Sequence, residues 1–201
     1  MTKLILYACP VGELAIQIEQ YFQESLKRYG NNAAHAYMPH CTLTGFFEKE
    51  NSDPPHQKDT IISHYTQTLT SILAEHRPLL PTSSIIVEPL IYKDNWHGLP
   101  LRADGLKHLA ACFAAQASLP TQTEAIRLKD WLHLSLAYDF EPEHAEGLKQ
   151  LATQMIDSTM SVSWELRFYE RDSKRDNTSP QRLTQESPLK DQWTCHCSLP
   201  L

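Results

Sequence analysis

Two short segments of this chain place a histidine and a hydroxyl two residues apart in extended, apolar surroundings. They are His40-Cys41-Thr42 and His133-Leu134-Ser135. On a β-strand, residues i and i+2 point to the same face, so each segment offers an imidazole and a hydroxyl on one surface. The residues between and after them, such as Cys41 and Leu134, point to the opposite face. Two such strands side by side would form a cleft with two imidazoles and two hydroxyls.

This set of groups suits the hydrolysis of a phosphodiester. One neutral imidazole can take a proton from the attacking water, while a cationic imidazole gives a proton to the departing ribose oxygen. The hydroxyls of Thr42 and Ser135 can donate hydrogen bonds to the non-bridging phosphate oxygens. Either histidine can play either part. Our working assignment makes His133 the base and His40 the acid.

A single histidine followed by Ser or Thr at i+2 is a weak signal, and only the two matching segments together indicate a catalytic site. Four of the ten histidines have Ser or Thr two positions later, namely His40, His64, His133 and His196. His64 lies in a helical pattern, where i and i+2 diverge. The His196 segment lacks the small residue and aromatic that occur in both Thr44-Gly45-Phe46 and Ala137-Tyr138. The alternative for either motif taken alone is ordinary strand packing.

The rest of the chain predicts elements that bring the two histidine strands together. Hydrophobic periodicity predicts helices at 13–29, 59–76, 104–117 and 141–156, and strands at 3–8, 37–47, 84–92, 97–102, 131–138, 161–169 and 192–199. Segments 48–58 and 170–190 are predicted to be polar or charged loops. Each half contributes a helix, a histidine-bearing strand, a second helix and two extended segments, which predicts a pseudo-repeat.

Composition limits the classes of ligand and location. A net charge of -6 argues against wholesale binding of duplex nucleic acid, so a phosphate ligand is expected to be small or terminal. No apolar run reaches the length of a membrane span and the N-terminus has no signal-peptide layout, so we expect a cytoplasmic protein. The five scattered cysteines are expected to be free thiols.

At its two motifs the chain resembles the two-histidine phosphoesterase superfamily. Within that superfamily it is most similar to the plant and fungal cyclic nucleotide phosphodiesterases, through Met38-Pro39-His40, through His133 to Tyr138, and through the late Trp193-Thr194 strand. The resemblance covers most of the chain. It implies one α+β domain, residues 1–201, with a bilobal, pseudo-twofold fold of two interleaved lobes. Two antiparallel sheets would form a central cleft, with helices outside.

The resemblance also implies an activity and a site. The activity would be metal-independent hydrolysis of ADP-ribose 1″,2″-cyclic phosphate or of nucleoside 2′,3′-cyclic phosphates, without a cofactor. Carried onto this sequence, the catalytic residues are His40 and His133. The substrate-binding residues are Thr42, Ser135 and Tyr138, of which Tyr138 matches a tyrosine that helps to hold the catalytic water. The segments 48–58 and 170–190 depart from the plant pattern, so the substrate can differ even if the chemistry is retained.

Other residues are weaker candidates. Lone basic residues at strand ends are usually solvated, and aromatic residues near the predicted cleft usually pack in the core. We expect no metal at Cys195-His196-Cys197, because alternate strand residues cannot converge on one ion. The basic candidates for a phosphate cleft are Arg102, Arg127, Lys129 and Arg171, and the aromatic candidates for stacking on a base are Tyr37, Phe46, Trp96 and Trp131.

Three alternatives remain open beside the cyclic phosphodiesterase. An RNA-end-processing nuclease or a 2′,5′-phosphodiesterase would share the same tetrapeptides. A non-catalytic module that binds a nucleotide or an RNA end would keep the cleft without needing a complete acid–base pair. In each case the expected partner is a small cyclic phosphate or an RNA terminus, bound by a monomer.

Overall fold

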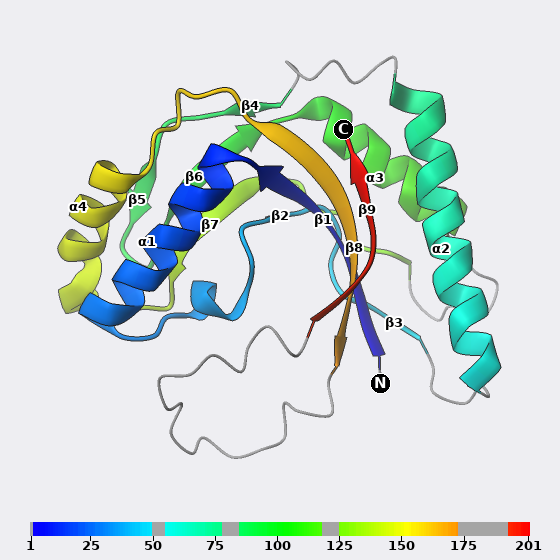
Figure 1. Ribbon diagram of the computed structural model, residues 1–201, viewed down its shortest axis with the longest axis horizontal. Coiled ribbons are helices and arrows are strands. Elements are labelled where there is room, and N and C mark those ends of the chain that lie inside the picture. The colour runs from blue at the N-terminus through cyan, green and yellow to red at the C-terminus, as the bar shows by residue number, and fades with distance from the viewer. Residues whose placement is uncertain (1, 50–54, 78–84, 118–124, 173–192) are drawn as a thin grey trace.

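The described residues form an antiparallel β-sheet that packs against four α-helices (Figure 1). The computed structural model describes residues 2–49, 55–77, 85–117, 125–172 and 193–201. The elements in chain order are β1 (Thr2–Val11), α1 (Glu13–Tyr29), η1 (Ala33–Ala36), β2 (Cys41–Thr42), β3 (Phe47–Lys49), α2 (Pro55–His76), β4 (Ile86–Val87), β5 (Ile91–Lys93), β6 (Trp96–Arg102), α3 (Asp104–Ala117), β7 (His133–Tyr138), η4 (Pro142–His144), α4 (Ala145–Met155), β8 (Ser163–Asp172) and β9 (Trp193–Pro200).

The strands form one continuous sheet in the order β4-β6-β7-β2-β1-β8-β9, with β3 also paired to β1 and β5 to β6. The predicted α+β class is confirmed, but the prediction of two separate sheets is wrong. The sheet is continuous because the short strand β2 pairs on both sides. Cys41 lies opposite Ala8 of β1 and also opposite Leu134 of β7. The two histidine motifs therefore lie on neighbouring strands.

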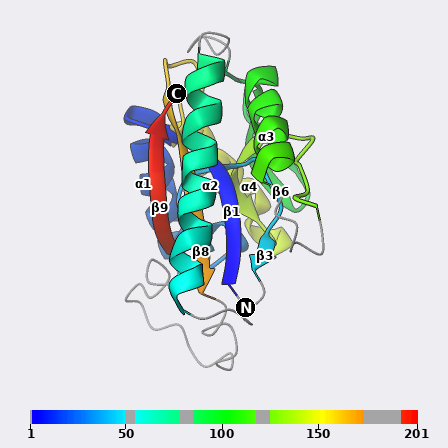
Figure 2. The ribbon, with the colours of Figure 1, turned by 90° about the vertical axis from the view of Figure 1, so that its right-hand side faces the viewer.

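The helices form two pairs, α1 with α4 and α2 with α3 (Figures 1 and 2). Each pair joins a helix of the first half of the chain to a helix of the second half. Strand β1 shows how the sheet divides its side chains. Leu4, Leu6 and Ala8 belong to the large core beneath the helices, whereas Ile5 and Tyr7 belong to a separate cluster. This alternation leaves the second face of the sheet to the side chains of a site.

All four predicted helices occur, but two of them differ at their starts: α2 begins early, and the predicted helix 141–156 opens with the 3-10 helix η4 and becomes α-helical only over Ala145–Met155. Helices α1 and α3 have the predicted bounds. Helix α2 begins at Pro55, inside the segment predicted to be a loop. Proline is tolerated in the first turn because the N–H groups there have no intrahelical acceptor. Residues 48 and 49 of the same predicted loop belong to β3, and residues 50–54 lie outside the described residues. None of the described helices combines the length and the apolar composition that a bilayer span requires.

The predicted strand 37–47 is the main error in the local structure. Only Cys41–Thr42 and Phe47–Lys49 are strands, and His40 stands one residue before β2. The ladder with β1 is interrupted because the Thr44 hydroxyl, and not a backbone carbonyl, accepts a hydrogen bond from the Leu6 N–H at 3.1 Å. The predicted strand 84–92 is divided into two short strands, β4 and β5, and the other strand predictions match β1 and β6 to β9 within a few residues. Strand β8 extends to Asp172, so the predicted loop 170–190 begins inside a strand, and its residues 173–190 lie outside the described part.

Candidate active site

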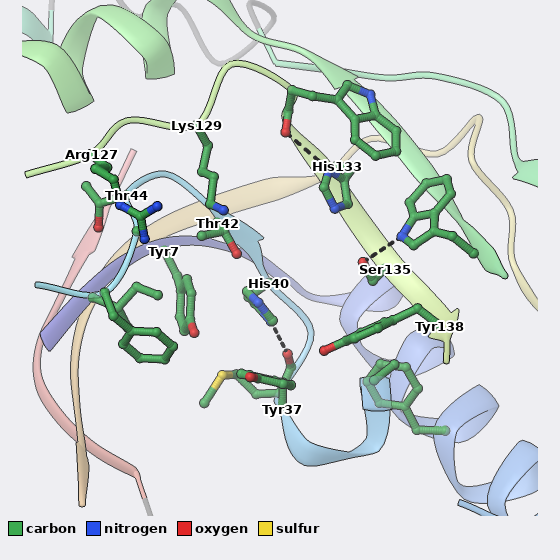
Figure 3. A pocket seen from close by; sticks show the side chains of 18 residues that line it. Tyr7, Tyr37, His40, Thr42, Thr44, Arg127, Lys129, His133, Ser135 and Tyr138 are labelled. Carbon is green, nitrogen blue, oxygen red and sulfur yellow. Dashed lines mark hydrogen bonds between the residues drawn. The ribbon is translucent and has the colours of Figure 1, made fainter. Parts of the chain in front are cut away.

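A pocket of ≈ 330 Å³ lies on the sheet face opposite the main core, where β1, β2, β6 and β7 meet (Figure 3). The pocket is lined by all five residues that the sequence analysis assigned to the active site. The lining residues are Ile5, Tyr7, Phe22, Ala34, Tyr37, Met38, His40, Thr42, Thr44, Gly45, Phe46, Trp96, Arg127, Lys129, Trp131, His133, Ser135 and Tyr138. Cys41 and Leu134 are buried in the core beneath, as the i, i+2 alternation predicts.

The two histidines are held in the same way. The Nδ1 atom of His40 lies 2.7 Å from the carbonyl oxygen of Met38, and Nδ1 of His133 lies 3.1 Å from the carbonyl oxygen of Trp131. A carbonyl oxygen can only accept, so each Nδ1 must carry a proton. In the neutral ring Nε2 is then the free acceptor. Figure 3 shows both rings directed into the pocket with these bonds behind them.

Aromatic rings enclose both imidazoles. His40 packs against Tyr7 and Tyr37, with ring centroids 4.1 and 5.2 Å away. His133 packs against Trp131 and Trp96 at 4.0 and 5.2 Å. This burial lowers the pKa of His40 to about 4, with a further lowering from nearby His133 that the Met38 hydrogen bond opposes. Burial also lowers the pKa of His133, with smaller contributions from two lysines. Both rings are therefore neutral at pH 7 in the free protein.

The hydroxyls are presented as donors. The indole N–H of Trp96 donates a hydrogen bond of 2.9 Å to the Ser135 oxygen. Because Trp96 is a donor only, the Ser135 hydroxyl proton must point elsewhere and can be given to a ligand. Thr44 is held similarly, since its oxygen accepts from Leu6 N–H. The sequence missed both Trp96 in this role and Thr44 as a lining residue. Thr44 follows Thr42 at i+2, which was a usable signal.

Two basic residues reach the pocket from an irregular segment. Gly45 N–H donates to the Arg127 carbonyl at 2.8 Å, and Lys129 N–H donates to the Leu43 carbonyl at 3.1 Å. This short antiparallel contact turns Arg127 and Lys129 toward the pocket. Gly45 leaves room for the guanidinium, because a Cβ there would lie 3.3 Å from an Arg127 side-chain nitrogen.

The charge of the pocket is opposite to that of the chain. The lining holds two basic side chains and no acidic one, in the part of the chain that the structure describes, although the whole sequence carries a net charge of -6. A pocket with positive charge, hydroxyl donors and two imidazoles is complementary to an anion.

Tyr138 lines the pocket beside His40. Its hydroxyl shares a hydrogen bond with the Tyr37 side chain, and burial, reinforced by Tyr37, raises its pKa. The phenol therefore stays protonated and can donate to a ligand or to water. Figure 3 shows Tyr138 and Tyr37 at one end of the pocket, with Thr42, Lys129 and Arg127 toward the other.

The other candidates from the sequence lie outside the pocket. Arg102 is exposed near Glu88, Arg171 lies over the Trp193 ring, and the His196 ring bonds to Glu170 at 2.9 Å. Cys41 is fully buried, which raises the pKa of its thiol to about 12 and makes it a poor nucleophile.

One group of side chains in the described residues places nitrogen and sulfur donors close enough to share a metal ion. It consists of His76, His108 and Cys112, none of which lines the pocket. Cys195, His196 and Cys197 do not form such a group. The thiol of Cys195 instead donates to the Cys197 carbonyl.

Comparison with known proteins gives partial relatives. No family model matches the chain. The chain is 33% identical over 173 residues to the mouse ubiquitin-associated and SH3 domain-containing protein B. This match covers 85% of the chain and 25% of the relative. It is 31% identical over 186 residues to the ecdysteroid-phosphate phosphatase of Bombyx mori, and this match covers 91% of the chain and 26% of the relative. A protein of the same name from Drosophila melanogaster is 26% identical over 208 residues, 90% of this chain and 27% of the relative.

The chain thus spans about a quarter of the length of the curated relatives it matches. Two of the relatives carry phosphatase names, which supports a relationship to phosphoesterases. The plant and fungal cyclic phosphodiesterases that the motifs resemble are not among these relatives.

Proposed function

We propose that this chain is a two-histidine phosphoesterase that opens a cyclic phosphodiester, with His40 and His133 as the acid–base pair. The observation that carries the proposal is the repeated geometry of the two imidazoles. Each donates Nδ1–H to the carbonyl two residues before it, and each directs Nε2 into the same pocket. Two Nε2 atoms on opposite sides of one phosphate can divide the work of proton removal and proton delivery.

The proton balance of the reaction is simple. The neutral imidazole takes a proton from water, whose oxygen attacks phosphorus. The protonated imidazole gives its proton to the ribose oxygen as the P–O bond of the ring breaks. The products are a phosphomonoester and a histidine pair that still holds one proton, now on the other ring. The pair is reset when the ring that acted as the base loses its proton to solvent and the ring that acted as the acid gains one.

Burial favours an order of roles that reverses our working assignment. The more strongly lowered pKa belongs to His40, so a single shared proton resides on His133. His40 is then the base and His133 the acid. An anionic phosphate between the rings raises both pKa values and supports protonation of His133.

The remaining lining residues are proposed to bind the phosphate and the rest of the substrate. Thr42 and Ser135 donate to the non-bridging oxygens, and Lys129 with Arg127 neutralises their charge. Trp131 is 44% exposed at the pocket and is our candidate for stacking on a base. A 2′,3′-cyclic nucleotide, ADP-ribose 1″,2″-cyclic phosphate or a cyclic-phosphate RNA end each provides such groups.

Hydrolysis of a phosphomonoester is the second candidate, because two relatives are named ecdysteroid-phosphate phosphatase. The same pocket could bind a monoester dianion, and the acid histidine could protonate its alcohol. A pure binding module is the third. Its cleft would need no tautomer-fixed histidine pair.

A substrate panel with EDTA present distinguishes these functions. Phosphorus NMR would follow a 2′,3′-cyclic nucleotide, ADP-ribose cyclic phosphate, a cyclic-phosphate-ended oligonucleotide, p-nitrophenyl phosphate and an ecdysteroid phosphate. We expect ring opening of at least one cyclic compound to a single monoester, with little release of inorganic phosphate. Turnover of the monoesters alone would replace the proposal by the second candidate. Calorimetric binding without turnover of any compound would support the module.

A further inference from the structure

We propose that His76, His108 and Cys112 form a binding site for a divalent transition metal of the zinc type, separate from the active site. The site joins the end of α2 to the middle of α3. The nitrogen and sulfur donors of the three side chains all lie within 4.8 Å of one another. This combination of imidazole and thiolate is the ligand set that zinc prefers over hard cations such as magnesium.

The helix geometry already places two of the ligands. His108 and Cys112 are four residues apart on α3, so they lie on the same face of the helix, one turn apart. The distance between His108 Nε2 and Cys112 Sγ is 3.6 Å. Zn–N and Zn–S bonds of about 2.05 and 2.3 Å at a tetrahedral angle separate the two ligand atoms by about 3.6 Å. This edge of the coordination tetrahedron is therefore present without a metal.

His76 supplies the third ligand from the neighbouring helix. Its ring meets that of His108 edge to face, with centroids 5.0 Å apart. Its Nδ1 atom is shielded from solvent and has no hydrogen-bond partner among the described residues. A buried nitrogen without a partner is unfavourable, and a metal bound through it would remove that cost.

The surroundings permit binding from solution. His108 is exposed, while His76 and Cys112 are half-buried, so an ion can enter without unfolding the helix pair. Binding would release the thiol proton of Cys112 to solvent as the sulfur becomes a thiolate. Three protein ligands leave the fourth position to water. Because none of the three residues lines the active-site pocket, we assign the metal to the stability of the α2–α3 pair and not to catalysis.

Titration of the reduced, metal-free protein with Zn²⁺ and Co²⁺ tests this site. We expect one high-affinity ion per chain, a thiolate-to-cobalt charge-transfer absorption, and a thermal midpoint raised by roughly 5 to 10 °C at a hundredfold excess of free zinc over Kd. His108→Ala and Cys112→Ser should each weaken zinc binding by about 100-fold or more, since loss of an outer-shell partner alone costs about 10–100-fold. The exposure of His108 makes misfolding of its variant a minor concern.

Cys195→Ser is the matched control, because Cys195 is an exposed cysteine beside another histidine. It should leave the affinity, the absorption and the thermal shift unchanged. The proposal is overturned if His108→Ala binds zinc as tightly as the parent protein, or if Cys195→Ser and not Cys112→Ser removes the charge-transfer absorption. Hydrolysis in EDTA is a separate readout, so failure of the metal site leaves the proposed function untouched.

Discussion

At the residue scale, the tautomer of each site histidine is set by a backbone carbonyl two positions earlier. The ring is thereby oriented with Nε2 toward the pocket before any ligand binds. Such preorganisation means that little reorganisation is needed when charge develops on the phosphate. The pKa values, and not the orientations, then decide which ring is the base.

The pH dependence of kcat/KM follows from those pKa values. The active form holds one proton on the pair, and its population is greatest between the two pKa values of the free enzyme. Both are lowered from 6.5, that of His40 to about 4. We expect an optimum on the acid side of pH 6.5 and a fall of about tenfold per pH unit well above it. A rate that rises from pH 6 to pH 9 would contradict the burial of the pair.

A substrate with a good leaving group tests the order of roles. A p-nitrophenyl phosphodiester needs no proton on its leaving oxygen, so it bypasses the acid. We expect His133→Ala to lose about 10²–10⁴-fold on a cyclic nucleotide but much less on the p-nitrophenyl ester. His40→Ala should lose comparable activity on both. The opposite pattern would restore His133 as the base.

The sequence was informative at this scale where it needed only local geometry. The i, i+2 alternation correctly grouped His40 with Thr42 and His133 with Ser135. It could not find Tyr7, because the contact of Tyr7 with His40 depends on β1 lying beside β2. Trp96 was noted only as an aromatic residue, since its bond to Ser135 requires the register between β6 and β7.

At the scale of elements, the join between β6 and β7 positions one half of the site. The register shifts between His97 and Gly98, and this bulge brings Trp96 opposite Tyr138 while Gly98 faces Ser135. A side chain at Gly98 has no space. Its Cβ would overlap the Leu134 carbonyl oxygen and lie 2.5 Å from the Trp96 ring. The glycine therefore permits both the bulge and the indole that orients Ser135.

Gly98→Ala should lower the free energy of unfolding by about 1–3 kcal/mol, because the backbone of β7 cannot yield as a flexible side chain does. Denaturant unfolding measures the change. Gly45→Ala is the matched control. The atoms nearest to its added Cβ would belong to the flexible Arg127 side chain, so its unfolding free energy should change by less than about 1 kcal/mol. Equal stability of the two variants would show that Gly98 is not required.

Element boundaries were predictable where the chain alone determined them. Helices α1 and α3 follow from apolar spacing, and for α1 also from Gly30, which takes a positive φ of 78° just after the helix. The short strand β2 was not predictable, because the Thr44 hydroxyl replaces a backbone acceptor for Leu6. Because β2 pairs with both β1 and β7, it joins all the strands into one sheet. Without knowledge of this strand, the sequence predicted two sheets. The His76–His108–Cys112 group was missed because His76 joins the α3 pair of His108 and Cys112 only through the packing of α2 on α3.

At the scale of the whole molecule, several histidines are held neutral by the fold. His35 accepts a hydrogen bond from the Asn32 N–H through Nδ1, and burial lowers its pKa to about 4. Burial likewise lowers the pKa values of His40, His97 and His133. In the unfolded chain these groups have pKa values near 6.5. At pH values between the folded-state pKa and about 6.5, the unfolded state therefore binds more protons than the folded state.

Stability should accordingly fall as the pH decreases. The contribution of these histidines is fully present above about pH 6.5 and is lost progressively toward pH 4, since stability rises with pH wherever the unfolded state binds more protons. For each histidine, a pKa that is lower by one in the folded state corresponds to at most about 1.4 kcal/mol in the free energy of unfolding. Urea unfolding at pH values from 4 to 8 measures the profile, which should become shallower in His40→Asn. A wild-type profile that is flat from pH 6.5 to pH 4 would contradict the neutral state of these rings.

The central claim is that one pair of imidazoles, from motifs far apart in the sequence, performs the hydrolysis. The most direct measurement compares initial rates of 2′,3′-cyclic nucleotide opening in EDTA for the parent protein, His40→Ala, His133→Ala and His196→Ala. His196 has the same local motif but bonds to Glu170 outside the pocket. The account predicts losses of about 10²–10⁴-fold for the first two variants and an unchanged rate for His196→Ala. Full activity in both His40→Ala and His133→Ala would contradict it.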